Sequence, residues 1–508
     1  MSSKVISQRF KGRSPLPTAT LFPFALALLC VAGFPGGAQT VPKTWDVAAM
    51  ESGILKPPVA GATVTRVTAD YYYRMRERAV YRRYPVYGSK SEPTGYLAKL
   101  ALADPEIVFN PVQLKSEQDW ILAGQDVFRS PITLLPIEFL PHFRGILERA
   151  GVPLAVDGTY PQLSLVVPKR GTIMIGMFSC AMCHTRIQAD GSKIEGGPGN
   201  VPDLLLGFPP VVQAARAFQR SLFHVPWIDK DPIDQVEGMS IEEINAIKAA
   251  LPLGVLARHG SSLFAPAQVP DLIGVKDLRY LDHTGLMRHR DAGDLMRYAA
   301  LNQGLDMVSD YSGYRPTAVM RGSDLKDNNL PAPETDERYS DAQLFALTKF
   351  LYSLTPPANP NRSSALSQRG AKVFAREGCN RCHTAPLYTS NKLIPAPGFV
   401  VTENDLRTYD IEPTVIGTDP ELTMRTRRGT GYYKIPSLRG VWYRGLFEHS
   451  GSVATLEDWF NPRRLRADYV PTGFKGFGVK TRAVPGHPFG LALSSDEKGA
   501  LIVFLRTL

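Results

Sequence analysis

Two short runs of the sequence combine cysteine and histidine at one fixed spacing. In each run two Cys lie three positions apart, and a His directly follows the second Cys. The residues are Cys180, Cys183 and His184 in the first run and Cys379, Cys382 and His383 in the second. Two Cys at this spacing can each form a thioether to one haem vinyl group, and the adjacent His can then bind the iron. The sequence therefore predicts two covalently attached c-type haems.

Two other kinds of site also use paired Cys. A zinc site could take one pair from each run, and a redox dithiol could form a reversible disulfide within one run. A four-Cys zinc site does not need a His after each pair, and a thioredoxin-like dithiol needs a βαβ setting that neither flank indicates. The haem interpretation accounts for both Cys and the His in each run.

The elements around the two runs form a repeat. A Gly followed by apolar residues three and four positions later opens residues 124–128 and 370–374, which predicts a short amphipathic helix before each run. After each run, a Pro-x-Leu-x-Gly-Val segment leads into His283-Thr284-Gly285 or His449-Ser450-Gly451, at a constant offset of 166 residues. Matching apolar segments, residues 347–354 and 501–508, then predict a terminal helix for each copy.

This order predicts a mainly α, loop-rich fold of two class I cytochrome c modules in tandem. The predicted parts are a signal peptide (1–38), an N-terminal lead-in (39–115), module 1 with an insertion (116–356), a linker (357–365) and module 2 (366–508). Module 1 is the larger because about fifty residues separate its first helix from Cys180, including the apolar stretch 132–146 and the β-like residues 163–167.

The sequence resembles the bacterial dihaem cytochrome c peroxidase superfamily, and within it the branch that contains the rubber oxygenases. The likeness covers roughly residues 115–508 and is carried by both haem motifs, the paired Pro-x-Leu-x-Gly-Val segments and residues 416–420, 429–433 and 451–457. It implies that one haem reacts with peroxide or dioxygen while the other stores or relays electrons. Rubber oxygenases bind dioxygen at the N-terminal haem and cleave a polyisoprene double bond.

Two departures from the family pattern concern the haem surroundings. The superfamily usually has Trp-Asp-Gly where this chain has His283-Thr284-Gly285, so an electron relay through that Trp is not expected here. The peroxidases supply a Met ligand to the C-terminal haem, yet this chain has no Met after Met424. A His ligand, with a lower reduction potential, is therefore expected at the second haem.

The remaining His residues offer candidates for the far side of each iron. For the second haem these are His487 and His449. His487 is preferred because its segment resembles the one that supplies a distal His in the rubber oxygenase branch, and His449 is then expected beside a propionate. For the first haem, His224, His259 and His289 are expected to be structural. His283 is in register with His449 and has three open roles: a distal ligand, an acid/base group beside an open iron, or a packing residue.

Composition and the first residues indicate an exported globular protein. The chain has 508 residues and 44% hydrophobic content, enough for two to four domains with cores. Four basic residues precede the apolar run 21–34 and the small residues 36–38, as in a cleaved signal peptide; an uncleaved anchor is the alternative. Removal of 1–38 lowers the net charge from +10 to about +6, which gives no support to nucleic-acid binding.

These observations predict a periplasmic or secreted dihaem oxidoreductase. In this hypothesis the N-terminal haem reacts with peroxide or dioxygen, the C-terminal haem is low-spin, and a small redox protein supplies electrons. One alternative is a non-catalytic electron-transfer cytochrome with both irons fully ligated. The other is a rubber oxygenase-like dioxygenase of a hydrophobic substrate, which rests on family likeness alone.

Overall fold

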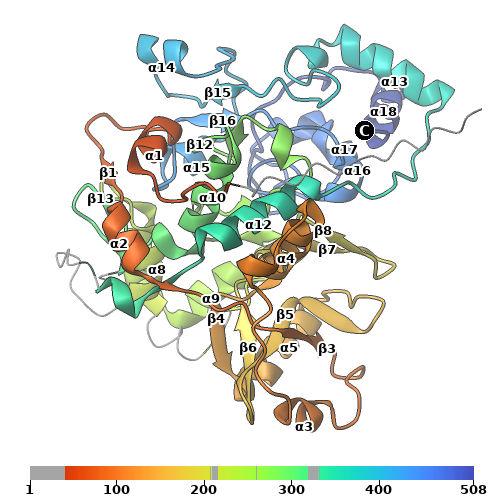
Figure 1. Ribbon diagram of the computed structural model, residues 1–508. Helices are drawn as coiled ribbons and strands as arrows, with labels where there is room; N and C mark the ends of the chain where they lie inside the picture. Colours follow the sequence, from red (N-terminus) through yellow and green to blue (C-terminus); the bar gives the residue numbers. More distant parts are fainter. Residues whose placement is uncertain (1–39, 206, 209–214, 259, 318–329, 331) are drawn as a thin grey trace, which may run out of the picture. The chain divides into compact units, whose positions relative to one another are not determined.

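The structure is a computed structural model that describes residues 40–508, except 206, 209–214, 259, 318–329 and 331 (Figure 1). The predicted signal peptide, residues 1–38, lies outside the described residues and stays a prediction. None of the helices in the described part of the chain has both the length and the apolar content needed to cross a membrane.

Sixteen α-helices are described, most of them short and separated by long loops. They are α1 (Val47–Gly53), α2 (Ala69–Arg74), α3 (Tyr96–Ala101), α4 (Glu117–Arg129), α5 (Leu140–Arg149), α6 (Cys180–Cys183), α8 (Ala215–Phe223), α9 (Ile241–Ala249), α10 (Ala292–Ala300), α12 (Asp341–Ser353), α13 (Ala365–Arg376), α14 (Glu403–Thr408), α15 (Glu421–Met424), α16 (Val441–Arg444), α17 (Leu456–Trp459) and α18 (Ser495–Arg506). The predicted helical, loop-rich character is confirmed.

The strands are mostly two- or three-residue ladders. They are β1 (Val64–Thr65), β2 (Arg76–Glu77), β3 (Arg83–Tyr87), β4 (Thr133–Pro136), β5 (Thr159–Lys169), β6 (Thr172–Met177), β7 (Thr185–Ile187), β8 (Lys193–Glu195), β9 (Val255–Leu256), β10 (Ala267–Gln268), β11 (Tyr280–Leu281), β12 (Met287–Arg288), β13 (Asp310–Tyr311), β14 (Glu337–Arg338), β15 (Leu393–Pro395) and β16 (Tyr432–Lys434).

One antiparallel sheet has the strand order β3-β5-β6-β4; β4, β5 and β6 lie in the stretch predicted as the insertion, whereas β3 lies in the predicted lead-in. In its register Leu165 faces Ile175, which in turn faces Leu135. The β-like residues 163–167 belong to β5, whose residues 162–167 are all buried. Burial without alternation, which includes the polar Gln162 and Ser164, shows that this part of the strand is covered on both faces.

Helices α4 and α12 cross where their backbones come close. A Cβ atom on Gly124 would lie 1.9 Å from the carbonyl oxygen of Ala346 and 2.9 Å from Cβ of Phe350. Only glycine permits this approach. The ring of Phe128, one turn further along α4, lies 5.1 Å from that of Phe350 between ring centres. The Gly and the Phe of the predicted first helix therefore both contact the predicted terminal helix.

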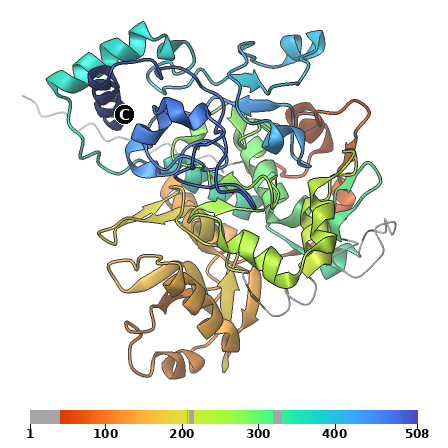
Figure 2. The ribbon, with the colours of Figure 1, turned by 180° about the vertical axis from the view of Figure 1, so that it is seen from behind.

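Helices α13 and α18 cross in the same way and lie side by side in both views (Figures 1 and 2). A Cβ atom on Gly370 would lie 2.0 Å from the carbonyl oxygen of Ala500 and 2.7 Å from Cβ of Phe504. The rings of Phe374 and Phe504 are 5.3 Å apart. The same Gly-to-Ala and Phe-to-Phe contacts thus occur in both copies of the repeat.

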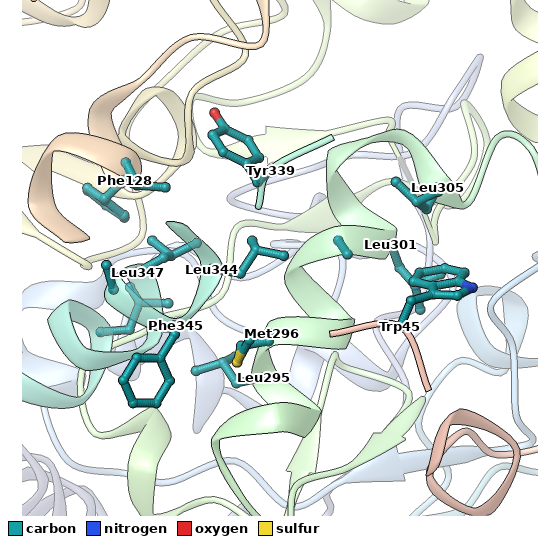
Figure 3. Packing of buried hydrophobic residues seen from close by; sticks show 14 of the residues in the cluster. Trp45, Phe128, Leu295, Met296, Leu301, Leu305, Tyr339, Leu344, Phe345 and Leu347 are labelled. Atoms are coloured by element: carbon teal, nitrogen blue, oxygen red, sulfur yellow. The ribbon is translucent and has the colours of Figure 1, made fainter. Parts of the chain in front are cut away.

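The largest apolar core packs around α10 and α12 (Figure 3). Figure 3 shows Phe128 beside Leu347 at one end of this core, and Trp45 close to Leu301 at the other. The ring of Trp45 stacks on Tyr72 at 4.7 Å. The lead-in that the sequence left without a function therefore supplies aromatic side chains to this core.

Candidate haem sites

The second Cys-x-x-Cys-His motif follows helix α13. Cys379 opens a single 3₁₀ turn, η7 (Cys379–Arg381), and His383 comes just after it. His383 Nδ1 lies 3.1 Å from the carbonyl oxygen of Tyr388, and the ring is buried. Because a carbonyl oxygen only accepts, Nδ1 carries the proton and Nε2 keeps a lone pair. Metal-bound His residues are commonly oriented by such a bond, which leaves Nε2 as the ligand atom.

His487 lies opposite His383. The two ring centres are 6.4 Å apart and the ring planes meet at 54°. Two imidazoles on one metal ion, each at a metal–nitrogen distance of about 2 Å, place their ring centres roughly 6 Å apart. Burial, followed by the nearby His383 and Arg464, lowers the pKa of His487 to about 3, so its ring is neutral at pH 7. The structure therefore brings these two His into a spacing that suits a shared iron.

The backbone of His487 is held in place by a buried arginine. Arg464 is fully buried and donates to the carbonyl oxygens of Gly486 and His487, each at 2.8 Å. The His487 amide donates to Ile416 O at 2.8 Å, and φ of His487 is 47°, in the left-handed region. Arg464 also donates to the carbonyl oxygens of Trp459 and Val484, and a buried guanidinium with four carbonyl partners is costly to displace. The position of the ring thus depends on a network outside the motif.

A cavity of about 410 Å³ lies between these residues. It is lined by the motif residues Cys379, Cys382 and His383, by His487, and by the apolar side chains of Phe374, Leu456, Leu501 and Leu505. The cavity is apolar, carries one pair of thiols and has a neutral imidazole on each of two sides. These are the donor groups that a c-type haem with two His ligands needs. The residues present therefore fit this group.

His449 lines the same cavity but has other partners. Its Nε2 lies 2.7 Å from Glu448 Oε1 and 3.1 Å from Tyr433 Oη, and its ring stacks on Tyr433 at 4.8 Å. Burial disfavours the charged ring, but the Glu448 carboxylate outweighs it and raises the pKa of His449. His449 Nε2 also lies 3.1 Å from the carbonyl oxygen of Asp419, so this nitrogen is already engaged by the protein. Of the two candidates, only His487 has its ring against that of His383.

The first motif forms a single helical turn, α6, capped by Ser179. His184 Nδ1 lies 3.0 Å from the carbonyl oxygen of Pro270, the Pro of the Pro-x-Leu-x-Gly-Val segment. Burial, reinforced by Arg258, lowers the pKa of His184 to about 4. The ring is therefore neutral with a lone pair on Nε2, as at His383. In both motifs, a backbone carbonyl oxygen orients the His that follows the second Cys.

Polar side chains contact the thiols of the first motif. Gln303 Nε2 lies 3.2 Å from Cys180 Sγ, and Arg258 Nη1 lies 3.6 Å from Cys183 Sγ. Gln303 belongs to a one-turn π-helix, η5 (Leu301–Leu305), an element that often marks functional sites. The four described Cys are unpaired thiols, so neither pair forms a disulfide. No group of three or more metal-ligating side chains gathers in the described part of the chain, so the alternative four-Cys zinc set does not occur there.

Those candidate ligands of the first haem that the structure describes form hydrogen bonds to other residues. His224 Nδ1 bonds to Asp231 Oδ2 at 2.9 Å, and His289 lies between Leu278 O and Tyr352 Oη. His259 lies outside the described residues. Among the described residues, no His ring packs against that of His184.

His283 lies on the wall of the cavity of the second motif rather than beside Cys180. Its Nε2 lies 2.7 Å from the carbonyl oxygen of Gln268, so Nε2 carries the proton and Nδ1 is the remaining acceptor. Burial lowers the pKa of His283, with Asp282 opposing the shift. The ring is therefore neutral at pH 7 and can accept a proton at Nδ1. Which of its three roles it fills stays a prediction.

Two backbone hydrogen bonds link the repeat copies reciprocally. Lys434 N donates to His283 O at 3.0 Å, and Gln268 N donates to His449 O at 2.8 Å. Gln268 and Lys434 are equivalent in the repeat, as are His283 and His449, because each pair is separated by 166 residues. Each copy therefore binds the His-x-Gly turn of the other through the same atoms.

Sequence reasoning missed the basic residues around the two sites. Arg464, Arg258 and Lys434 belong to no motif, and Arg258 lies 75 residues from the Cys183 thiol that it contacts. No local pattern marks such residues, because their roles arise only when distant loops meet.

Comparisons with known proteins find weak sequence similarities. The chain is 28% identical over 163 residues to the cytochrome-c peroxidase IdrP1 of Denitromonas iodatirespirans, which covers 28% of this chain and 40% of that protein. It is 25% identical over 184 residues to the uncharacterized protein y4iJ of Sinorhizobium fredii, which covers 30% of this chain and 29% of that protein. The chain thus spans less than half the length of either relative. No protein-family model matches it.

Solved structures give alignments of low similarity. The diheme peroxidase BthA from Burkholderia thailandensis aligns with 80% of this chain and 91% of its own, at 16% identity and a TM-score of 0.33. A MauG-like protein associated with microbial copper homeostasis aligns with 59% of this chain and 88% of its own, at 15% identity and a TM-score of 0.28. Both TM-scores are too low to support an argument about the fold.

Proposed function

Because its motifs and its similarity to a cytochrome-c peroxidase support a relation to the dihaem cytochrome c peroxidase superfamily, we propose that this chain is an exported dihaem c-type oxidoreductase. Its N-terminal haem reacts with peroxide or dioxygen, and its C-terminal haem is low-spin and stores or relays electrons. The observation that carries the proposal is an asymmetry. His383 has the neutral ring of His487 at 6.4 Å, whereas His184 has no described His ring against it.

The paired helix crossings support the tandem arrangement of two class I cytochrome c modules. Gly124 meets Ala346 in one crossing, and Gly370 meets Ala500 in the other. Helix α4 of the first crossing packs against α6, which carries Cys180 and Cys183. Phe374 of α13 and Leu501 of α18 line the cavity that contains the second pair of thiols. Strands β4, β5 and β6, which form a sheet with β3 of the lead-in, belong to the insertion that enlarges the first module.

Each haem would be held by the two thiols and the His of its motif. Cys180, Cys183 and His184 hold the first, and Cys379, Cys382 and His383 hold the second. His487 would supply a second His to the iron of the latter haem. A haem iron with an open position supplies the chemistry of peroxide or dioxygen activation, and a six-coordinate one supplies electron transfer.

His283 is the acid/base candidate for proton movement in this scheme. Its proton on Nε2 is fixed by the Gln268 carbonyl, and its free Nδ1 accepts a proton in a buried environment. It lies on the wall of the second-motif cavity. We therefore expect His283 to affect the reaction with peroxide by supplying protons at the junction between the modules.

The test combines one spectrum with one rate measurement on the purified dihaem protein. The ferric protein should show a high-spin band from one haem only and should react with hydrogen peroxide. His283→Ala should keep haem content and the high-spin signal while slowing the peroxide reaction roughly a hundredfold or more, the usual scale for loss of an acid/base group. If His283 is a ligand instead, the same variant gains a high-spin haem and binds cyanide faster.

Two results would overturn the proposal. A ferric spectrum with both haems low-spin and no reaction with peroxide would identify an electron-transfer cytochrome. A protein that ignores peroxide but consumes dioxygen with polyisoprene would identify the rubber oxygenase-like alternative. A His283→Ala protein that matches the parent in spectrum and rate would reduce His283 to a packing residue.

A further inference from the structure

Lys434 lies on the wall of two cavities at once. It ends strand β16, where it pairs with Leu393 of β15. One of the cavities is the 410 Å³ space lined by Cys379, His383 and His487. The other is a space of about 250 Å³ lined by residues of both modules, among them Pro270 and Tyr443. The side chain is thus half-buried, and the cavities account for its remaining exposure.

The ammonium group of Lys434 has no carboxylate partner among the described residues. The two nearest acidic groups that act on it are already engaged. Asp282 accepts from Tyr298 Oη at 3.0 Å, and Asp271 accepts from Arg444 Nε at 2.9 Å and Tyr443 Oη at 2.7 Å. Burial lowers the pKa of Lys434 to about 8, although Asp282 opposes the shift. An unpaired cation at such a position costs stability unless an anion completes the site.

We propose that Lys434 binds a propionate carboxylate of the haem attached at Cys379 and Cys382. The inference rests on the proposed function, because it requires the second haem. That haem brings two carboxylates into a cavity whose other walls are mostly apolar. Lys434 and Arg444 are cationic side chains shared by both cavities, and Arg444 is already paired with Asp271. Lys434 therefore has the free charge that a buried carboxylate needs.

The position of Lys434 also makes it a determinant of the reduction potential. A positive charge near a haem favours uptake of an electron, and pairing with a propionate keeps that carboxylate ionised. Because the Lys434 amide also donates to His283 O at 3.0 Å, the residue joins the second haem site to the module that carries the first. The positive charge of Lys434 would therefore help to set the reduction potential of the second haem, which lies beside the junction between the modules.

The experiment measures the midpoint potential of each haem by spectroelectrochemical titration of the dihaem protein. Lys434→Gln should lower the electron-uptake constant of the His383/His487 haem roughly tenfold, which is about 59 mV for one electron. The potential of the other haem should move less. The matched control is Lys392→Gln, which removes the same charge from a half-exposed side chain beside β15 and should shift the potential far less. Lys434→Arg, which keeps the charge, should retain the parent potential.

A second readout identifies the source of the carboxylate. Without Lys434 the propionate pKa rises, so reduction takes up a proton and the midpoint potential should fall with pH between about pH 5 and 8, where the parent is flat. If the parent potential instead responds to added sodium acetate, and Lys434→Gln removes only that response, the carboxylate comes from solution and the propionate assignment is overturned. Should Lys434→Gln fail to assemble, Lys434→Met supplies a neutral side chain of similar length.

Haem content and spin state are recorded on the same samples. A parent protein with fewer than two haems overturns the proposed function itself. Two haems, of which only the His383/His487 haem is low-spin, together with potentials and a pH dependence unchanged by Lys434→Gln, overturn only the assignment of Lys434.

Discussion

In the proposed function, the ring of His487 distinguishes the second haem site from the first. Replacing it by Gly should convert one haem, and only one, from low-spin to high-spin, because the 6.4 Å spacing to His383 leaves no other described imidazole in that place. The absorbance spectrum of the ferric protein measures the change. Added imidazole should enter the space that the ring leaves and restore the low-spin spectrum.

His449→Gly is the matched control for His487→Gly. His449 is bound to Glu448 at 2.7 Å and stacks on Tyr433, so its loss should leave the spin state of both haems unchanged. An unchanged spectrum in His487→Gly together with conversion in His449→Gly would show that the ligand has been assigned to the wrong His.

Individual residues differ in how well the sequence predicts them. The thiols and His184 or His383 follow from spacing within five positions, so a local motif suffices. The carbonyl partners Pro270 and Tyr388 could not be predicted from a motif, although Pro270 lies in a repeated segment. Arg464 gave no signal at all, because three of its four carbonyl partners come from a loop twenty or more residues away.

At the scale of elements, periodicity predicts the helices that border the haem sites. The segments 124–128, 370–374, 347–354 and 501–508 fall within or overlap α4, α13, α12 and α18, because an apolar stripe at helical spacing needs a partner surface. The sequence did not predict the sheet β3-β5-β6-β4 beyond one β-like segment. Strands β5 and β6 form a hairpin, but β3 and β4 join it from distant parts of the sequence, and no short-range pattern encodes that pairing.

The crossing of α13 and α18 should tolerate no side chain at Gly370. In Gly370→Ala the new Cβ would lie 2.0 Å from the backbone oxygen of Ala500, so the helices must move apart. We expect a loss of about 1–3 kcal/mol or more in the free energy of unfolding, the range for overpacked cores. Chemical denaturation of the holoprotein, followed by circular dichroism, measures it.

Gly499→Ala is the control for this crossing. Gly499 lies in the same helix α18, is exposed, and has no atom within 4 Å of a new Cβ. Removing a helical glycine there should stabilise the protein by about 0.5–1 kcal/mol. Equal effects of the two substitutions would contradict the close crossing.

At the scale of the whole described chain, the two copies of the repeat are joined by equivalent contacts. The reciprocal bonds through His283 O and His449 O use atoms 166 residues apart, and Gly285 and Gly451 each approach an apolar side chain of the other module, Leu393 and Val255. The sequence predicted the repeat but not this exchange, since an offset states which residues are equivalent and not which ones touch. The turn containing His283 is therefore part of the junction between modules as well as a candidate for proton transfer.

The whole molecule is expected to depend on its haems for stable packing. The apolar residues Phe374, Leu456, Leu501 and Leu505 face the 410 Å³ cavity, and without a group to fill it they lose the contacts that a packed core provides. Cys382→Ala removes one thioether and should sharply lower the yield of protein that carries two haems, as measured by intact mass and haem absorbance. Cys30→Ala is the control, because Cys30 lies in the predicted signal peptide and should leave both yield and mass of the mature protein unchanged. Recovery of a normal amount of folded Cys382→Ala protein whose mass includes no haem would contradict the covalent haem assignment at its first step.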